Sequence, residues 1–346
     1  MKVAIVGAGL IGRLIALRLI PANHEITLLE ANSFDNPTSA VALSAGLISP
    51  MSESVRIPPQ VLELGFQSYR LWPEILRNLN ELDPEHQPVT YQTDGTIAVS
   101  FQEEQTCLLE HKQKLQRALS DYPSNLQMLY NEEVAAVEPE LERFETAIFL
   151  NDEANLCNAE FLKSSSRAIR KHASIVDYWA LKGDGTELQK QYDWVLDCRG
   201  AGAVGRHTHA DKLAQKLGSV RGEVIRVHTK NVKLTRPVLV IQQRFTIYIV
   251  PKPNNIFVVG ATDIDKHGSQ AVTVRSSLDL LSALYAIHPG FSGAEIMSVI
   301  AGERAFYENQ IPAVTEYENI LTLNGLNRHG WLAGPALVES LIQKIS

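Results

Sequence analysis

The stretch VAIVGAGLIG, residues 3–12, decides the fold of this chain. It overlaps Lys2–Val6, a short apolar run typical of a buried strand, and the residues after it have the composition of a helix. Its glycines, Gly7, Gly9 and Gly12, have the spacing Gly-x-Gly-x-x-Gly. In such a turn the first glycine permits a tight bend, the second lets a pyrophosphate approach the backbone, and the third lets helix and strand pack closely. The stretch therefore predicts a dinucleotide-binding βαβ unit.

A second strand with an acidic end completes this unit. Residues Glu25–Glu30 have the composition of a buried strand, and Glu30 follows Gly12 by 18 residues. A carboxylate at this position can accept hydrogen bonds from both hydroxyls of a ribose and would repel a 2′-phosphate. Leu10 and Ile11 would open the helix, whose amino terminus faces the phosphates with its partial positive charge. The alternative is a glycine-rich turn in another α/β fold, and the motif does not separate NAD from FAD.

Composition and charge exclude several classes of protein. The 346 residues are enough for two domains, and 32 basic against 39 acidic residues give a net charge of −7. Without a Lys/Arg cluster, nucleic acid is not expected as a partner. Arg13 and Arg18 interrupt the apolar amino terminus, and no other stretch of about 18 apolar residues occurs, so we expect neither a signal peptide nor a transmembrane segment. Cys107, Cys157 and Cys198 are too far apart for a disulfide framework or a metal site, and suit a reducing cytoplasm.

Past the first unit, strand-rich segments begin to alternate with α/β segments. The run TSAVALSAGLISPMSE, residues 38–53, is rich in small residues, which let a flat ligand approach the backbone; a flexible surface loop is the alternative. Helical spacing over Val61–Leu79 predicts a helix with a break or kink at Pro73. Asp94 and Gly95 lie between two short alternating runs, so a hairpin is predicted there.

The second half of the chain has the same alternation. Strands are predicted over residues 174–180 and 187–196, and the second runs into another Gly-x-Gly turn at Gly200 and Gly202. Ligands of open α/β sheets bind at the carboxyl ends of strands, so this turn is a candidate cofactor contact. A longer strand-rich region follows, and a last helix is predicted from about Gly334 to Ile345. Two lobes built from interleaved segments are the simplest account of this order.

Eight pieces of sequence occur in one characteristic order. They are VAIVGAGLIG (3–12), SAGLISP (44–50), WVLDCRGAGA (194–203), VRGEVIRV (220–227), IYIVPK (247–252), VVGATD (258–263), AGERA (301–305) and NGLNRHGWLAGPAL (324–337). Together they resemble the glycine oxidase branch of the D-amino-acid-oxidase-like FAD-dependent oxidoreductases. The chain departs from the pattern of that family at Ala305, where proline is expected, at Gly334, which interrupts an expected Leu-Ala-Pro, and at Asn327, where an aromatic residue is common.

The resemblance implies an α/β fold with two interleaved lobes. One lobe would be a Rossmann-like FAD-binding domain of residues 1–86, 140–216 and 296–346. The other would be an antiparallel β-sheet substrate domain of residues 87–139 and 217–295. Some relatives attach the flavin covalently through a cysteine in the last third of the chain. Because no cysteine lies beyond Cys198, the FAD is expected to be bound non-covalently.

The resemblance also implies a reaction. A small amine or amino acid would give a hydride from its α-carbon to flavin N5, and the imine would leave and hydrolyse. Dioxygen would reoxidise the flavin and yield hydrogen peroxide. In the resembled branch, oxidation of glycine supplies an imine for the thiazole of thiamin. Chains of this branch are often oligomeric, so a homo-oligomer is one expectation.

Site residues follow from the matching positions of the family. Those implied to bind the cofactor are Gly7, Gly9, Leu10, Ile11, Gly12, Glu30, Ser44, Ala45, Gly46, Leu47, Gly200, Gly202, Arg328, His329, Gly330, Trp331 and Leu332. Those implied to act on the substrate are Tyr248, Arg304, which would pair with a carboxylate, and Arg328. By pattern alone Tyr248 would be a core aromatic residue, and either arginine a surface or salt-bridge residue. Asp263 is left open between attracting a substrate ammonium and capping a strand end.

Three other functions remain open on the sequence. A D-amino-acid dehydrogenase would pass electrons to a quinone or carrier instead of oxygen. A flavin-binding maturation protein would act on another polypeptide. An NAD-dependent Rossmann dehydrogenase is disfavoured, because the small-residue run of residues 38–53 and the C-terminal arginine-helix element would lack a purpose.

Overall fold

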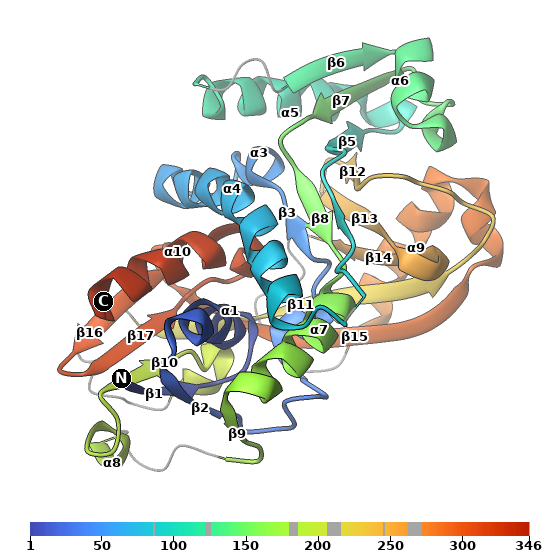
Figure 1. Cartoon of the computed structure of the whole chain (residues 1–346). Helices are drawn as coiled ribbons and strands as arrows, with labels where there is room; N and C mark the ends of the chain where they lie inside the picture. Colours follow the sequence, from blue (N-terminus) through green and yellow to red (C-terminus); the bar gives the residue numbers. More distant parts are fainter. Residues whose placement is uncertain are drawn as a thin grey trace.

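Two large β-sheets and one small sheet organise the fold (Figure 1). The computed structural model describes residues 1–85, 87–121, 126–179, 186–205, 216–244, 246–261 and 272–345. The chain passes several times between the two large sheets, so each sheet combines segments that are distant in sequence. The predicted α/β class with interleaved α/β and antiparallel parts is confirmed.

The first strand of the chain lies inside a six-stranded sheet with the order β16-β17-β10-β1-β2-β9. Its strands are β1 (Lys2–Val6), β2 (Glu25–Leu29), β9 (Ser174–Val176), β10 (Trp194–Asp197), β16 (Ala313–Tyr317) and β17 (Ile320–Asn324). All neighbours are parallel except β16 and β17. Parallel strands are covered on both faces, which explains why β1 is a continuous apolar run. The predicted βαβ unit at the amino terminus is confirmed.

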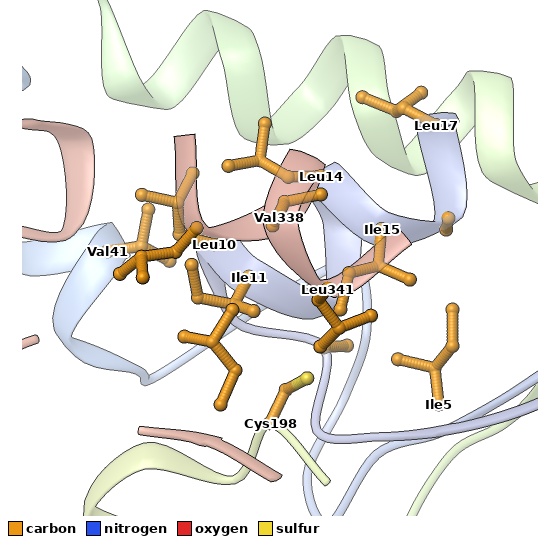
Figure 2. Packing of buried hydrophobic residues seen from close by; sticks show 14 of the residues in the cluster. Ile5, Leu10, Ile11, Leu14, Ile15, Leu17, Val41, Cys198, Val338 and Leu341 are labelled. Atoms are coloured by element: carbon orange, nitrogen blue, oxygen red, sulfur yellow. The ribbon is translucent and has the colours of Figure 1, made fainter. Parts of the chain in front are cut away.

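Four helices pack around one another beside this sheet: α1 (Leu10–Leu19), α4 (Pro59–Leu82), α7 (Asn158–His172) and α10 (Gly330–Ile345). Figure 2 shows Leu10, Leu14 and Ile15 of α1 beside Val338 and Leu341 of α10, all buried in one apolar cluster. The last helix therefore holds the first helix in place. The helix predicted to break or kink at Pro73 does not break there, and α4 continues through this residue.

The second large sheet has eight strands in the order β15-β11-β14-β13-β12-β5-β7-β6. They are β5 (Thr96–Val99), β6 (Leu126–Tyr130), β7 (Thr146–Leu150), β11 (Leu217–His228), β12 (Val238–Ile241), β13 (Thr246–Lys252), β14 (Ile256–Ala261) and β15 (Glu295–Tyr307). Neighbours are antiparallel except the parallel pair β5 and β12. Helices α5 (Gln105–Ala118) and α9 (Val274–Ile287) pack on this sheet.

Short elements join these larger parts. The small sheet consists of β3 (Leu47–Ile48), β8 (Ala154–Leu156) and β4 (Tyr91–Gln92), with β8 in the middle. The remaining short helices are α2 (Ala40–Leu43), α3 (Pro50–Glu53), α6 (Glu132–Val137), α8 (Thr186–Gln189), η1 (Ile20–Ala22), η2 (Gln102–Glu104), η4 (Pro139–Leu141), η5 (Gly200–Ala203), η7 (Pro253–Asn255) and η8 (Pro289–Gly293). Among the described helices, none is both long and apolar enough to cross a bilayer.

The predicted hairpin at Asp94 and Gly95 is wrong. Strand β4 before the turn pairs with β8, whereas β5 after the turn pairs with β7 and β12. Gly95 has a φ of +75°, and an added Cβ would lie 2.5 Å from the Leu150 carbonyl oxygen. The turn carries the chain from the small sheet to the eight-stranded sheet, and alternation alone does not show which partner a strand chooses.

Other predicted elements have different bounds. The strand predicted over residues 187–196 is a short helix, α8, followed by β10. The strand predicted from residue 174 ends at Val176, and residue 180 lies outside the described ranges. Strands β7 and β15 lie in ranges that the sequence assigned to the cofactor-binding lobe. In the structure both belong to the eight-stranded sheet, near its opposite edges. Otherwise the lobe boundaries stay a prediction.

Candidate active site

A cavity of about 650 Å³ lies where elements of the six-stranded and eight-stranded sheets meet. With the exception of Gly12, every predicted site residue lines this cavity. These residues are Gly7, Gly9, Leu10, Ile11, Glu30, Ser44, Ala45, Gly46, Leu47, Gly200, Gly202, Tyr248, Arg304, Arg328, His329, Gly330, Trp331 and Leu332. The structure therefore brings together residues that are up to about 320 positions apart in sequence.

The three glycines of the first turn differ in what surrounds them. Gly7 has a φ of +97°, and an added Cβ would lie 2.8 Å from the Cys198 carbonyl oxygen. At Gly12 an added Cβ would lie 2.0 Å from the Gly7 carbonyl oxygen, so Gly12 serves helix packing and does not line the cavity. An added Cβ at Gly9 would have no atom within 4 Å. The backbone at Gly9 thus borders open space at the amino terminus of α1, where an anion is favoured.

Glu30 is oriented by two backbone donors. Its Oε2 accepts a hydrogen bond from the Ala8 amide at 2.7 Å, and its Oε1 accepts one from the Asn32 amide at 2.9 Å. The carboxylate therefore has a fixed position at the end of β2, beside the glycine turn. Trp179, which sequence reasoning did not identify, lines the same end of the cavity and donates its backbone N–H to the Glu30 carbonyl oxygen at 2.8 Å. No motif marks Trp179, because the contact depends on the pairing of β9 with β2.

The small-residue run forms a fixed wall and not a flexible loop. Gly46 has a φ of +68°, and an added Cβ would lie 2.2 Å from the Leu156 carbonyl oxygen. The Leu156 amide donates to the Gly46 carbonyl oxygen at 2.9 Å. Ser44 Oγ accepts a hydrogen bond from Trp331 Nε1 at 2.7 Å, which connects this wall to α10. Lys252 Nζ donates to the Leu156 carbonyl oxygen at 2.8 Å from behind the wall.

Tyr248 and Arg304 reach the cavity across neighbouring strands. Tyr248 on β13 lies over Gly260 of β14, where an added Cβ would be 2.2 Å from the phenol oxygen. Arg304 on β15 lies over Gly222 of β11, where an added Cβ would be 3.0 Å from the guanidinium. Two strand glycines therefore make room for the two side chains. Burial raises the pKa of Tyr248, so the phenol stays protonated and can donate a hydrogen bond.

Glu53 is a site residue that sequence reasoning missed. It ends α3, lines the cavity and forms a salt bridge with Arg328, with 2.8 Å between Oε2 and Nη2. Burial opposes ionisation of Glu53, but attraction by Arg328 and the hydrogen bond from it prevail and lower its pKa. Burial lowers the pKa of the adjacent His329 to about 4, so this imidazole is neutral at pH 7. The only sequence signal for Glu53 was its place at the end of the small-residue run.

The last helix begins at Gly330, four residues earlier than predicted from Gly334. Pro335 lies inside it and cannot donate a backbone hydrogen bond to the Trp331 carbonyl oxygen. That oxygen accepts instead from Trp72 Nε1 at 2.9 Å, which lets the helix continue past Pro335. The amino end of α10, with its partial positive charge, therefore borders the cavity at Gly330.

Three further residues from the sequence analysis are Cys198, Asn327 and Asp263. Cys198 lines the cavity, and burial raises the pKa of its thiol well above the usual value. This thiol is therefore uncharged and a poor nucleophile at neutral pH. Asn327 has a φ of +49°, a conformation that asparagine adopts more readily than an aromatic residue does. Asp263 lies outside the described residues.

Similarity to known proteins identifies the family. A protein-family model described as DAO, FAD dependent oxidoreductase, matches residues 2–343. The chain belongs to this family. Its cofactor is FAD, and the open backbone at Gly9, the oriented Glu30 carboxylate and the small-residue wall all fit an extended dinucleotide.

Relatives cover this FAD-dependent oxidoreductase almost end to end. It is 31% identical over 346 residues to a Rhizobium etli protein named a thiamine biosynthesis oxidoreductase, ThiO, covering all of this chain and 96% of that protein. The crystal structure of glycine oxidase from Geobacillus kaustophilus has a TM-score of 0.83 at 22% identity, covering 99% of this chain and 94% of that chain. Iminodiacetate oxidase from Chelativorans sp. BNC1 has a TM-score of 0.79 at 20% identity, covering 99% and 95%. At these identities the two structures support the fold alone.

Proposed function

We propose that this FAD-dependent oxidoreductase oxidises a small amino acid or amine to an imine, with dioxygen as the electron acceptor. The observation that carries the proposal is that a guanidinium, Arg304, and a protonated phenol, Tyr248, line one cavity with the dinucleotide-binding turn. Names of the relatives, ThiO and glycine oxidase, support a small amino acid such as glycine and a role in forming the thiazole of thiamin.

Arg304 and Tyr248 would orient the substrate. An arginine fork matches a carboxylate through two parallel N–H donors, and the phenol of Tyr248 would donate a third hydrogen bond. A substrate fixed by its carboxylate presents its α-carbon in one direction, which is the main requirement for this reaction. When bound, FAD supplies the acceptor for the hydride of the α-carbon, and dioxygen then takes the electron pair and two protons to give hydrogen peroxide. The released imine takes up water to give ammonia and a carbonyl compound.

Different parts of the cavity would bind different parts of FAD. Gly7 and Gly9 would hold the pyrophosphate and Glu30 the ribose, whereas residues 44–47 and 328–332 would hold the ring system. The partial positive charge at the start of α10 would stabilise negative charge on the reduced ring. Burial of Cys198 and the absence of any later cysteine support non-covalent FAD. A cytoplasmic location and a homo-oligomer remain part of the proposal.

The decisive experiment follows the flavin directly. Purified protein is mixed without oxygen with glycine, sarcosine, D-alanine or D-proline, and the visible flavin absorption is recorded. We expect at least one of them to bleach the flavin and, in air, to cause oxygen uptake with formation of peroxide. Bleaching without oxygen uptake would instead identify a dehydrogenase, and a flavin bleached by none of the four would contradict the proposed substrate class.

A variant tests the role of Arg304. Arg304→Met should raise KM for the amino acid by about 100-fold, because two charge-assisted hydrogen bonds to the carboxylate are lost. Arg77 on α4 is exposed, so Arg77→Met is the matched control and should leave KM unchanged. An unchanged KM in Arg304→Met would remove this residue from the carboxylate role.

A further inference from the structure

The first helix contains a buried arginine directly after the glycine motif. Arg13 is 0% exposed, although its neighbours on α1 are apolar and line the core. Its guanidinium donates hydrogen bonds to three backbone carbonyl oxygens and two hydroxyl groups: Ala8 O at 2.9 Å, Phe34 O at 2.6 Å, Leu162 O at 3.2 Å, Ser165 Oγ at 3.0 Å and Ser166 Oγ at 2.9 Å. All five of these acceptors are uncharged groups.

Packing alone does not account for this cation. Burial lowers the pKa of Arg13 to about 10, while attraction by the carboxylates of Glu30 and Asp35 opposes that shift, so the side chain is still charged at pH 7. A buried charge without a carboxylate among these contacts is unfavourable, and an apolar side chain of similar size often packs as well or better. We therefore expect the compensation for this free-energy cost to come from the groups that Arg13 holds in place.

One contact fixes the direction of a peptide group. Arg13 Nε binds the carbonyl oxygen of Ala8, which belongs to the same planar trans peptide as the amide of Gly9. In such a peptide the C=O and N–H groups point in opposite directions. Because Arg13 holds the Ala8 oxygen on its own buried side, the Gly9 N–H points away from it, and Gly9 lines the cavity.

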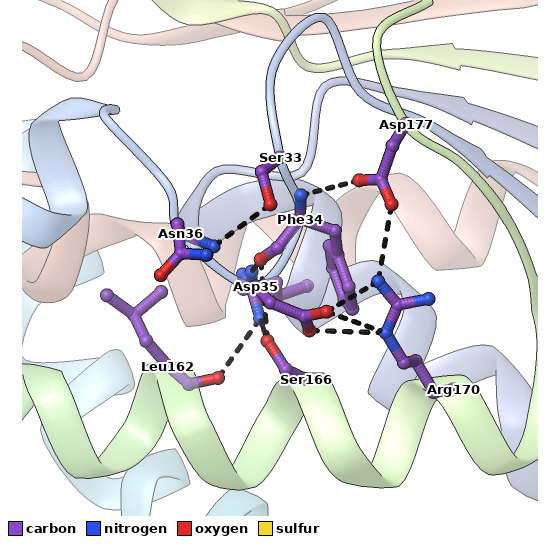
Figure 3. Close-up of polar contacts among 9 residues, drawn as sticks. Ser33, Phe34, Asp35, Asn36, Leu162, Ser166, Arg170 and Asp177 are labelled. Atoms are coloured by element: carbon purple, nitrogen blue, oxygen red, sulfur yellow. Dashed lines mark hydrogen bonds and ion pairs between the residues drawn. The ribbon is translucent and has the colours of Figure 1, made fainter.

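A second contact fixes the segment that follows Glu30. Arg13 Nη2 binds the Phe34 carbonyl oxygen, and its guanidinium lies 4.1 Å from the centre of the Phe34 ring. Figure 3 shows further contacts that hold the same segment: Asp177 accepts a hydrogen bond from the Phe34 amide, and Arg170 pairs with Asp35 and Asp177. The segment is thus clamped where it leaves the cavity wall.

The two contacts converge on Glu30. The Ala8 amide donates to Glu30 Oε2, and the Asn32 amide donates to Glu30 Oε1, so both donors to this carboxylate come from segments that Arg13 holds. Arg13 reaches the turn on one side of Glu30 and the following segment on the other side, without lining the cavity itself.

We propose that Arg13 is a positioning residue for the ADP half of FAD. It directs the Gly9 N–H toward the pyrophosphate and holds the Glu30 carboxylate for the ribose, acting through Ala8 and Phe34. This inference rests on the FAD cofactor of the family and is independent of the proposed amine substrate. It assigns Arg13 no contact with the flavin ring or the substrate.

The test measures how firmly each half of the cofactor is held. Holoenzyme carrying Arg13→Met is diluted, and release of FAD is followed by the fluorescence of the free flavin. Added ADP and added riboflavin serve as competitors that report on the two halves separately. Arg18 lies on the same helix and is exposed, so Arg18→Met is the matched control.

We expect Arg13→Met to raise the Kd of FAD by about 10-fold to 100-fold, because hydrogen bonds from a charged donor are lost. The inhibition constant of ADP should rise by a similar factor, whereas that of riboflavin should not change. The absorption band of the bound flavin and kcat at saturating FAD should also stay the same. An unchanged Kd of FAD, or equal losses for ADP and riboflavin, would overturn the proposal and leave Arg13 a residue of the core.

A second variant covers the case in which Arg13→Met does not fold. Arg13→Lys keeps the charge, but one ammonium group cannot replace the fork that reaches Ala8 and Phe34 together. We expect a Kd of FAD raised by about 5-fold or more, with a far-ultraviolet spectrum like that of the parent protein. A Kd equal to that of the parent protein would contradict the proposal.

Discussion

The two ends of the cavity are built in different ways. At the end that contains Glu30, the glycine turn and the end of β2 come from one short part of the chain, residues 7–32, and hydrogen bonds from the Ala8 and Asn32 amides hold the Glu30 carboxylate. At the end that contains Tyr248, side chains come from elements far apart in sequence, namely α3, β13, β15 and the start of α10. Charged pairs such as Glu53 with Arg328 hold this second wall.

The two ends of the cavity are therefore expected to tolerate different kinds of substitution. A wall of backbone depends on the space around its glycines, so an added methyl group at some positions is disruptive whatever its chemistry. A wall of side chains on a rigid sheet can change its charges while the backbone stays in place. Within one family, the cofactor end is therefore expected to stay constant while the substrate end varies.

The largest expected effect comes from the glycine that contacts backbone. Gly12→Ala should reduce the free energy of unfolding by about 3 kcal/mol or more, because its Cβ would lie 2.0 Å from the Gly7 carbonyl oxygen. Gly9→Ala is the control within the same motif: with open space around the added Cβ, stability should change by about 1 kcal/mol or less. Urea unfolding of both variants measures this, and equal losses would show that the turn has no such asymmetry.

At the substrate end, the coupling between Glu53 and Arg328 is expected to be moderate. A double-mutant cycle with Glu53→Gln and Arg328→Met should give a coupling energy of about 1–3 kcal/mol at pH 7, measured by urea unfolding with FAD in excess. Because the folded-state pKa of Glu53 is lowered, this contribution is present above the unfolded-state pKa and is lost as pH falls through the folded value. A coupling that stays constant as pH falls through the folded-state pKa of Glu53 would show that it does not depend on the carboxylate charge.

A buried acid behind α3 gives a pH-dependent effect. Glu153 accepts hydrogen bonds from the amide and the hydroxyl of Ser52, the hydroxyl at 2.8 Å, and burial raises its pKa to about 7. Between its ordinary value and pH 7 the folded state holds a proton that the unfolded state has released, so stability falls as pH rises through this window. Glu153→Gln removes that fall. The free energy of unfolding of the variant, relative to that of the parent protein, should therefore rise by roughly 1–3 kcal/mol from pH 4 to pH 8. The same difference at both pH values would be the contradicting result.

The smallest effect is expected where charge is exposed. Arg18 of α1 and Glu339 of α10 form a salt bridge with side chains 48% and 37% exposed. Glu339→Gln should change the free energy of unfolding by about 0.5 kcal/mol or less, because solvent screens such pairs. A larger loss would mean that the attachment of α10 to α1 depends on charge as well as on their apolar contact.

The cofactor end could be predicted from sequence because its signals are local. Lys2–Val6, the three glycines and Glu30 each contribute a backbone or hydrogen-bonding property that holds wherever a strand, a turn and a helix follow one another. Arg13 shows the limit, since its polar partners are visible only once α7 is packed against α1.

The substrate end depends on contacts that sequence order does not contain. Glu53 became recognisable only through Arg328, which lies 275 positions later. The Asp94-Gly95 turn has the local pattern of a hairpin, yet its two strands join different sheets. The start of α10 was misplaced because the carbonyl oxygen left by Pro335 finds a donor in Trp72, on another helix.

The strand order of the six-stranded sheet determines when a newly made chain can first hold its cofactor. Strand β1 is synthesised first, but it lies between β2 and β10, and β10 requires β17 as its other neighbour. The amino end of α10, which closes the cavity wall, is synthesised about 320 residues after β1. Domains fold as units during synthesis, and this unit stays incomplete until α10 has been made. The cavity wall is therefore complete only once α10 has been made, and until then the apolar face of α1 lacks the helix that buries it.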